Sequence, residues 1–93
     1  MGTIEGRVIA LDKQSLLAAV DIGWGQAIVM EFNQFHALSE GDWLENLQNG
    51  YGSIQCYNSS QQNFLEVTVL SGSVPSDTAL FVINSRQNVA DAA

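Results

Sequence analysis

Apolar residues in this chain recur mainly at every second position, which is the period of a β-strand with one buried face. The alternating runs are short and are separated by turn residues, so a mainly β fold is expected. A sheet of this size must close on itself or be covered. The pattern therefore predicts five or six strands in a small barrel or a strongly bent antiparallel sheet. The runs cover residues 3–12, 16–22, 26–32, 42–47, 51–57 and 64–70.

Alternation also predicts which side chains share a face of each strand. Gly6 interrupts the first run and indicates a bend or a bulge. The last run is the most regular and places Glu66 and Thr68 on its outer face. The residues that we expect to share a face within each of five runs are Ile4, Gly6, Val8 and Ala10; Leu16, Ala18, Val20 and Ile22; Ile28, Met30 and Phe32; Ile54 and Cys56; and Leu65, Val67 and Val69.

Glycine and asparagine mark the turns between these runs. Gly23-Trp24-Gly25 predicts a turn between the second and third strands, because glycine adopts positive φ at no steric cost. Asn49-Gly50 predicts a tight turn, and residues 58–63 predict a polar loop. A turn does not require the indole of Trp24. That side chain either folds back over one end of the barrel or marks a contact surface.

Two segments depart from the alternation. Phe35–Leu38 is compatible with one helical turn that ends at Gly41. Near the C-terminus, Ser76 or Asp77 is expected to cap a short helix from Thr78 to about Ser85. The β-type composition of residues 80–83 leaves a strand as the alternative.

The chain is expected to form one domain, residues 1–93. Residues 3–70 would form the barrel. Residues 76–86 would form a segment that covers it, and residues 87–93 would form a frayed tail.

The charge balance limits the partners. Ten acidic residues oppose three basic ones, Arg7, Lys13 and Arg86, and the net charge is −7. Binding of a nucleic-acid backbone needs several Lys or Arg contacts, so nucleic acid is not an expected partner. An anionic membrane surface is disfavoured for the same reason. The acidity is better explained by solubility or by a basic partner protein.

Cysteine use and the N-terminal sequence point to the cytoplasm. Cys56 is the single cysteine, so no disulfide within the chain is expected. The first residues contain acids and no long apolar segment, unlike a secretory signal, and no apolar run is long enough to span a membrane. A reducing compartment is the expectation.

No motif indicates catalysis, a cofactor or a metal ion. The sequence contains one cysteine, Cys56, and one histidine, His36. A cysteine nucleophile needs a base and an orienting group nearby. The acids Glu40, Asp42 and Glu45 lie close together but lack the spacing of a calcium loop. We therefore predict a non-enzymatic protein, with no catalytic, cofactor or metal residues.

Aromatic side chains are the best remaining candidates for a contact surface, because few charges accompany them and aromatic residues are enriched in protein interfaces. Tyr51, Tyr57 and Phe64 are expected to share one surface if the outer strand faces are exposed. The alternative is that these rings complete the core of a thin barrel. The full candidate interaction surface is Trp24, Phe35, Tyr51, Tyr57 and Phe64.

Three stretches resemble OB-fold and S1-type domains. Gly6–Asp12 resembles the opening strand of that family, Val20–Gly25 the second strand with its Gly turn, and Glu40–Asp42 the Gly-Asp turn before the fourth strand. SH3-like barrels share the Gly-Asp turns. The resemblance covers about residues 4–70 and implies a barrel that holds single-stranded nucleic acid on strands two and three, with aromatic stacking. The third strand departs from this pattern, since it offers Ile28, Met30 and Phe32 instead of a basic face.

Three functional hypotheses result. The first is a non-enzymatic β-barrel that acts through protein–protein contacts, with a homodimer as one form. The second is binding of single-stranded nucleic acid or a small ligand on an OB-like face. The third is an acidic inhibitor that mimics nucleic acid and binds a basic partner.

Overall fold

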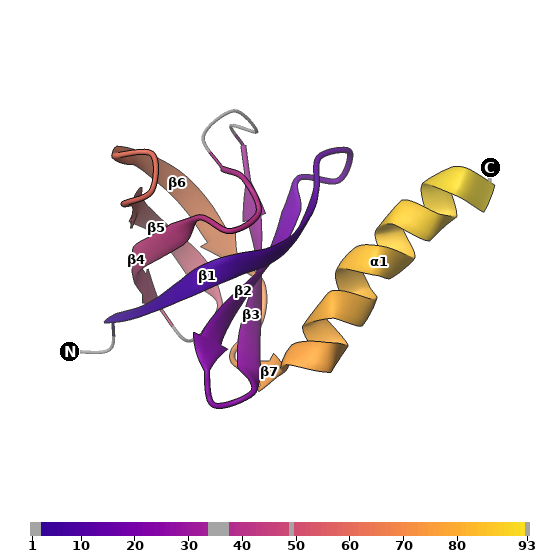
Figure 1. The fold of residues 1–93 in the computed structure, drawn as a ribbon, viewed down its shortest axis with the longest axis horizontal. Coiled ribbons are helices and arrows are strands. Elements are labelled where there is room, and N and C mark those ends of the chain that lie inside the picture. Colours follow the sequence, from indigo (N-terminus) through magenta and orange to yellow (C-terminus); the bar gives the residue numbers. More distant parts are fainter. Residues whose placement is uncertain (1–2, 34–37, 49, 93) are drawn as a thin grey trace.

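A computed structural model describes residues 3–33, 38–48 and 50–92 of the chain. It contains seven β-strands followed by one C-terminal helix (Figure 1). The elements are β1 (Thr3–Asp12), β2 (Leu17–Gly23), β3 (Gln26–Phe32), β4 (Trp43–Gln48), β5 (Gly52–Asn58), β6 (Asn63–Val69), β7 (Val74–Pro75) and α1 (Ser76–Ala92). Phe35 and His36, and with them the predicted helical turn up to Ala37, lie outside the described residues.

Six strands close into an antiparallel barrel, which is one of the two architectures that the alternation predicted. The strand order is β2-β1-β4-β5-β6-β3-β7, and an additional pairing of β2 with β3 closes the ring. Each half of the barrel is a three-strand meander, β1–β2–β3 and β4–β5–β6. The two halves join where β1 pairs with β4 and where β3 pairs with β6. The strand number exceeds the five of an OB-fold.

Gly6 lies close to the point in β1 where the pairing with β4 ends and the pairing with β2 begins. Residues 3–7 of β1 pair with β4, and residues 7–12 pair with β2. A Cβ atom at Gly6 would lie 2.7 Å from Cγ1 of Val20 and closer still to the carbonyl oxygen of Asp21. The register with β4 also shifts between Ile4 and Gly6. The predicted irregularity at this glycine is confirmed, and its cause is the close approach of β2.

The predicted faces of β1 are correct only for its first half. The register with β2 shifts between Val8 and Ala10. Val8 and Leu11 face the interior of the barrel, whereas Ala10 belongs to the opposite face. An irregularity of this kind inserts one residue into the alternation, and so the side chains that follow it exchange faces.

The barrel interior is filled by apolar side chains from all six strands. Leu38, from the loop before β4, is buried among them. The residues predicted to share a face in the second and third runs do so, and the inward set predicted for the last run is confirmed. The interior cluster is Val8, Leu11, Ala18, Val20, Ile28, Met30, Phe32, Leu38, Leu44, Leu47, Cys56, Leu65, Val67 and Val69.

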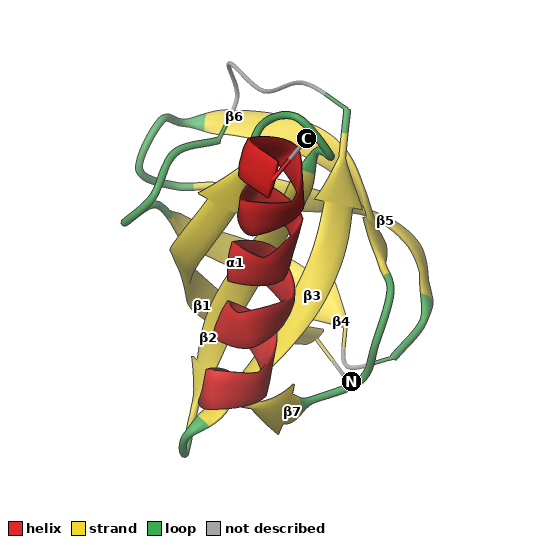
Figure 2. Cartoon of the chain, turned by 90° about the vertical axis from the view of Figure 1, so that its right-hand side faces the viewer, coloured by secondary structure: helices red, strands yellow, loops and turns green. Residues whose placement is uncertain are grey.

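Helix α1 covers the outer face of the sheet formed by β1, β2 and β3 (Figure 2). Ala79 and Ile83 lie one helical turn apart and pack on small residues of the sheet, such as Ala19 and Ala27. Strands β2 and β3 are therefore buried on both faces, which explains why they read as nearly continuous apolar runs. The expectation that the C-terminal segment covers the barrel is confirmed.

The boundaries of that segment differ from the prediction. The helix begins at Ser76 and continues through Ala92, so the predicted end near Ser85 is wrong and most of the supposed frayed tail is helical. Ser76 does not cap the helix, because its hydroxyl has no partner among the described residues. Its backbone N–H instead donates to the carbonyl of Gly25 at 2.9 Å.

The residues before the helix form a strand that the sequence did not predict. Pro75 and Val74 of β7 pair with Gln26 and Ala27 of β3. This pairing places the start of α1 beside the β2–β3 hairpin (Figure 1). Within the described part of the chain, no helix has the length and hydropathy needed to cross a membrane.

Candidate functional site

Trp24 occupies the tip of the β2–β3 hairpin. Gly23 pairs with Gln26, so Trp24 and Gly25 form a two-residue connection. Their φ angles are 61° and 71°, and positive values at both central residues are the feature of a type I′ turn. The carboxylate of Asp21 accepts a hydrogen bond of 2.8 Å from the N–H of Gly23, which supports the turn. The predicted Gly-rich hairpin is confirmed.

The side chain of Trp24 contributes nothing to the core. Its exposed fraction is 99%, so the indole does not fold back over the end of the barrel. A bulky residue at positive φ is unusual and costs about 1 kcal/mol, because its Cβ approaches the following carbonyl oxygen. Asparagine would suit this position better. The indole is thus held in a strained and fully accessible position, and the alternative that it folds back over one end of the barrel is wrong.

Two of the other predicted aromatic residues, Tyr57 and Phe64, lie at the opposite end of the barrel from Trp24, because β3 starts beside Trp24 and β6 runs antiparallel to it. Tyr57 and Phe64 pair across β5 and β6, with ring centroids 4.8 Å apart, and Phe64 remains largely exposed. Tyr51 is also exposed, but it precedes Gly52 and so lies at the other end of β5. Six residues of strand separate it from Tyr57 by roughly 20 Å. Phe35 lies outside the described residues.

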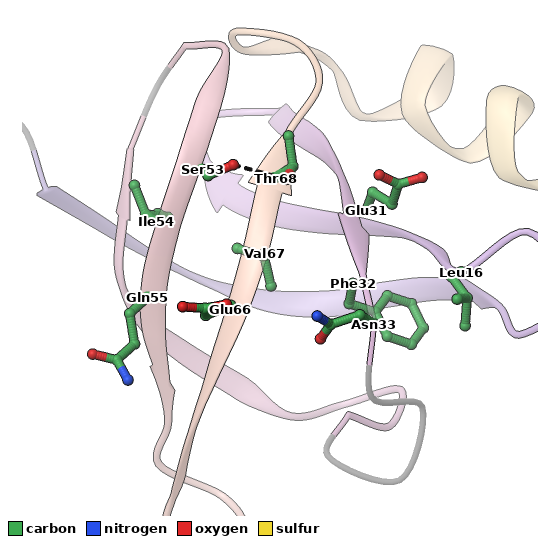
Figure 3. A pocket seen from close by; sticks show the side chains of 10 residues that line it. All are labelled: Leu16, Glu31, Phe32, Asn33, Ser53, Ile54, Gln55, Glu66, Val67 and Thr68. Carbon is green, nitrogen blue, oxygen red and sulfur yellow. Dashed lines mark hydrogen bonds between the residues drawn. The ribbon is translucent and has the colours of Figure 1, made fainter.

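A groove of about 410 Å³ lies on the barrel wall formed by β3, β5 and β6 (Figure 3). Phe32 and Val67 contribute to its floor, and Figure 3 shows Glu31 on the β3 side and Glu66 on the β6 side. Among the described residues that line it, these two glutamates are the only charged ones. The remaining lining residues are Leu16, Asn33, Ser53, Ile54, Gln55 and Thr68.

The register of three strands explains how this groove forms. Thr68 of β6 pairs with Glu31 on one side and with Ser53 on the other. The hydroxyls of Ser53 and Thr68 are hydrogen-bonded at 3.1 Å. The alternation of residues 64–70 correctly predicted that Glu66 and Thr68 lie on the outer face. The groove was not predicted, because the pairing of β3 with β6 joins segments that are far apart in the chain.

Asp42 holds the loop before β4 together. Its carboxylate accepts hydrogen bonds from the backbone of Ser39 at 2.9 Å, from Asn58 at 2.7 Å and from Gln61 at 2.7 Å. Its own backbone carbonyl accepts from the N–H of Val8 at 2.9 Å. The Gly-Asp turn therefore has a structural role. Among the residues that the structure describes, no three acids, histidines or cysteines are arranged to hold a metal ion.

Cys56 lies inside the barrel and is fully buried. Burial raises the pKa of its thiol to about 11, and a backbone hydrogen bond opposes this increase. The thiol is therefore protonated at neutral pH and is a poor nucleophile. His36, the base considered for it, lies outside the described residues.

Arg7 is already engaged in the fold. Its guanidinium donates to the carbonyl of Gly41 at 2.8 Å and lies over the ring of Trp43, 5.5 Å from the centroid. Lys13 lies apart from it, in the β1–β2 turn. These two basic side chains do not form a patch.

Comparisons with protein-family models, curated proteins and solved structures found no match to this chain.

Proposed function

We propose that this protein is a non-enzymatic interaction module that uses Trp24 as the anchor for a protein partner. The observation that carries the proposal is the indole at the hairpin tip, which is 99% exposed at a positive φ angle. The strain and the exposure both have a cost, and no contact with the described part of the barrel compensates for them. Strain of this kind concentrates at binding sites.

The surroundings of Trp24 support an anchor role. The hairpin is held by the Asp21 carboxylate on one side and by the hydrogen bond from Ser76 to Gly25 on the other. A rigid tip loses little conformational entropy when it binds, which favours affinity. Tryptophan is also one of the residue types enriched among those that dominate binding energy.

The net charge of the chain and its expected compartment add the type of partner and the location to the proposal. With a net charge of −7, the chain is expected to prefer a basic partner, and the single cysteine is compatible with a cytoplasmic location. Self-association through Trp24 is the second form of the proposal. It predicts a dimer in light scattering that becomes monomeric in the Trp24→Asn variant.

Quantitative affinity capture with wild-type, Trp24→Asn and Phe64→Ala baits tests the partner form. Phe64 is the matched control, because it is an exposed aromatic residue on a different hairpin. The proposal expects a protein that the wild-type and Phe64→Ala baits retain and that Trp24→Asn loses. Equal capture by all three baits would contradict it.

Tryptophan fluorescence then gives a direct readout. In a Trp43→Phe background Trp24 is the only tryptophan, since the chain contains two. Its emission should be that of a solvated indole and should shift to shorter wavelength when the captured protein is added. An unchanged spectrum in a saturated complex would argue against the anchor.

A further inference from the structure

The two glutamates of the groove, Glu31 and Glu66, lie on neighbouring strands of the barrel wall (Figure 3). Thr68 pairs with Glu31, and Glu66 precedes Thr68 by two residues on the same face of β6. The glutamates are therefore diagonal neighbours, and such residues have Cβ atoms roughly 7–8 Å apart in antiparallel strands. One small ligand can reach both carboxylates.

Neither carboxylate has a partner within the described part of the chain. No hydrogen bond or ion pair of Glu31 or Glu66 occurs there. The described residues that line the groove include no basic side chain. Like charges at this separation repel each other, so a ligand that carries positive charge would be favoured between them.

Further hydrogen-bond acceptors lie beside the two carboxylates. Thr68 has described strands on both sides, and its hydroxyl is hydrogen-bonded to that of Ser53 in β5 at 3.1 Å. Gln55 of β5 pairs with Glu66. Carboxylates accept hydrogen bonds and donate none, and hydroxyl and amide oxygens accept as well. The groove therefore suits a cation that brings several N–H donors.

The floor and the size of the groove indicate an organic cation. A calcium ion takes about six or more oxygen ligands, and no three acids, histidines or cysteines among the described residues could hold a metal ion. The volume of about 410 Å³ is in the range of small-molecule sites. The Phe32–Val67 pair lies between the two glutamates and contributes to the floor. Methylene groups pack on such a surface while charged ends remain hydrated.

We propose that this groove binds an aliphatic diamine or a longer polyamine. One ammonium group pairs with Glu31 and another with Glu66, and the methylene chain between them lies over Phe32 and Val67. This inference goes beyond the proposed function, because it concerns a different surface and a small molecule instead of a protein partner.

Titration calorimetry with 1,4-diaminobutane at low ionic strength tests the charge requirement. We expect saturable binding that weakens about fivefold or more in a Glu31→Gln/Glu66→Gln variant. A Glu5→Gln/Glu40→Gln variant removes the same charge from exposed residues outside the described groove lining and should bind nearly as well as wild type. Equal weakening in both variants would reduce the effect to general attraction and overturn the proposal, as would a lack of saturable binding.

Monoamines and longer diamines test whether both glutamates are used at once. Butylamine keeps the aliphatic stem but has one ammonium group, so it should bind wild type about fivefold more weakly than 1,4-diaminobutane. This difference should shrink in Glu31→Gln/Glu66→Gln. From 1,3-diaminopropane to 1,6-diaminohexane, the affinity for wild type should peak at one chain length. Equal affinities for butylamine and all the diamines would contradict a two-point site.

A peptide distinguishes a free diamine from lysine side chains of a protein. A terminally blocked Lys-Gly-Lys peptide carries two ammonium groups on separate flexible stems, and ordering both stems costs conformational entropy. It should therefore bind more weakly than 1,4-diaminobutane. Tighter binding of the peptide would assign the groove to a protein segment and overturn the proposal.

The Trp24→Asn variant separates this inference from the proposed function. It should bind 1,4-diaminobutane with the affinity of wild type, because Trp24 is not among the residues that line the groove. In amide NMR spectra of wild type, the shifts caused by the diamine should centre on Glu31, Ser53, Glu66 and Thr68. Loss of binding in Trp24→Asn, or shifts centred on another part of the barrel, would contradict the inference.

Discussion

The side-chain amide of Asn58 donates a hydrogen bond of 2.7 Å to the carboxylate of Asp42, and both residues are buried. This contact joins the loop before β4 to the end of β5. Gln61 in the following turn donates to the same carboxylate oxygen at 2.7 Å. One buried acid thus ties together segments that meet only in the folded barrel.

Replacing Asp42 should therefore destabilise the protein. In Asp42→Asn the amide has only one acceptor oxygen, and the buried donor of Asn58 loses its charged partner. We expect the free energy of unfolding to fall by about 1.5–3 kcal/mol in urea denaturation. Glu40→Gln removes a charge two residues away on an exposed position and should change stability by less than about 0.5 kcal/mol. A similar effect of both substitutions would show that charge alone matters.

Gly6→Ala tests the close approach of β1 and β2. The added methyl group would meet the backbone of Asp21 and the side chain of Val20, so one strand must shift. Overpacking of this kind costs about 1–3 kcal/mol, which thermal or urea unfolding would detect. Glu5→Ala is the control, because Glu5 is exposed on the same strand. A stable Gly6→Ala protein would mean that β1 bends by another means.

Two neighbouring substitutions in α1 should have unequal effects. Ile83 is fully buried between the helix and the sheet, whereas Phe81 is 71% exposed. Ile83→Ala should lower the free energy of unfolding by about 2–4 kcal/mol. Phe81→Ala removes the larger side chain but should change it by less than about 0.5 kcal/mol. The reverse order would show that α1 packs on the barrel through another face.

Trp24→Asn is expected to stabilise the isolated protein. Asparagine followed by Gly25 is the preferred sequence for a two-residue turn with positive φ angles. Relief of the strain at Trp24 should raise the free energy of unfolding by about 0.5–1 kcal/mol. Denaturant titration of the two proteins would measure this difference. A loss of stability would show that the indole supports the fold, and it would weaken the proposed function.

The raised pKa of Cys56 predicts a loss of stability in alkali. The folded thiol ionises near pH 11, whereas the unfolded thiol ionises near its ordinary value of 9.0. Below that ordinary value both states are protonated and the contribution to stability is complete. Between the two values only the unfolded state releases the proton, so stability falls by up to about 1.4 kcal/mol per pH unit. A Cys56→Ala variant should show a shallower decrease in urea midpoint over this range. An identical slope in both proteins would contradict the assignment.

Local patterns predicted the strands well. The boundaries of β3 were predicted to the residue, since its alternation and the flanking turn signals lie within the strand itself. The faces of β2 were also predicted, because a period of two needs no knowledge of the partner strands. At β1 the same reasoning failed beyond Val8, where the bulge exchanged the faces.

For the candidate site, the sequence identified Trp24 as unexplained by a turn but left its exposure open. The groove could not be predicted. It depends on the pairing of β3 with β6, and those strands are separated by the whole of β4 and β5. Pairing at such a distance is decided by how the two meanders fit around one core.

The sequence by itself determined that the chain forms short alternating strands joined by Gly-rich turns, with an acidic surface. These properties follow from side-chain polarity and backbone preference over a few residues. The tertiary structure alone decided that six strands close into a barrel, that α1 buries the second face of β2 and β3, and that Trp24 projects from the tip. These outcomes depend on packing between segments distant in the chain, and local periodicity carries no information about which segments meet.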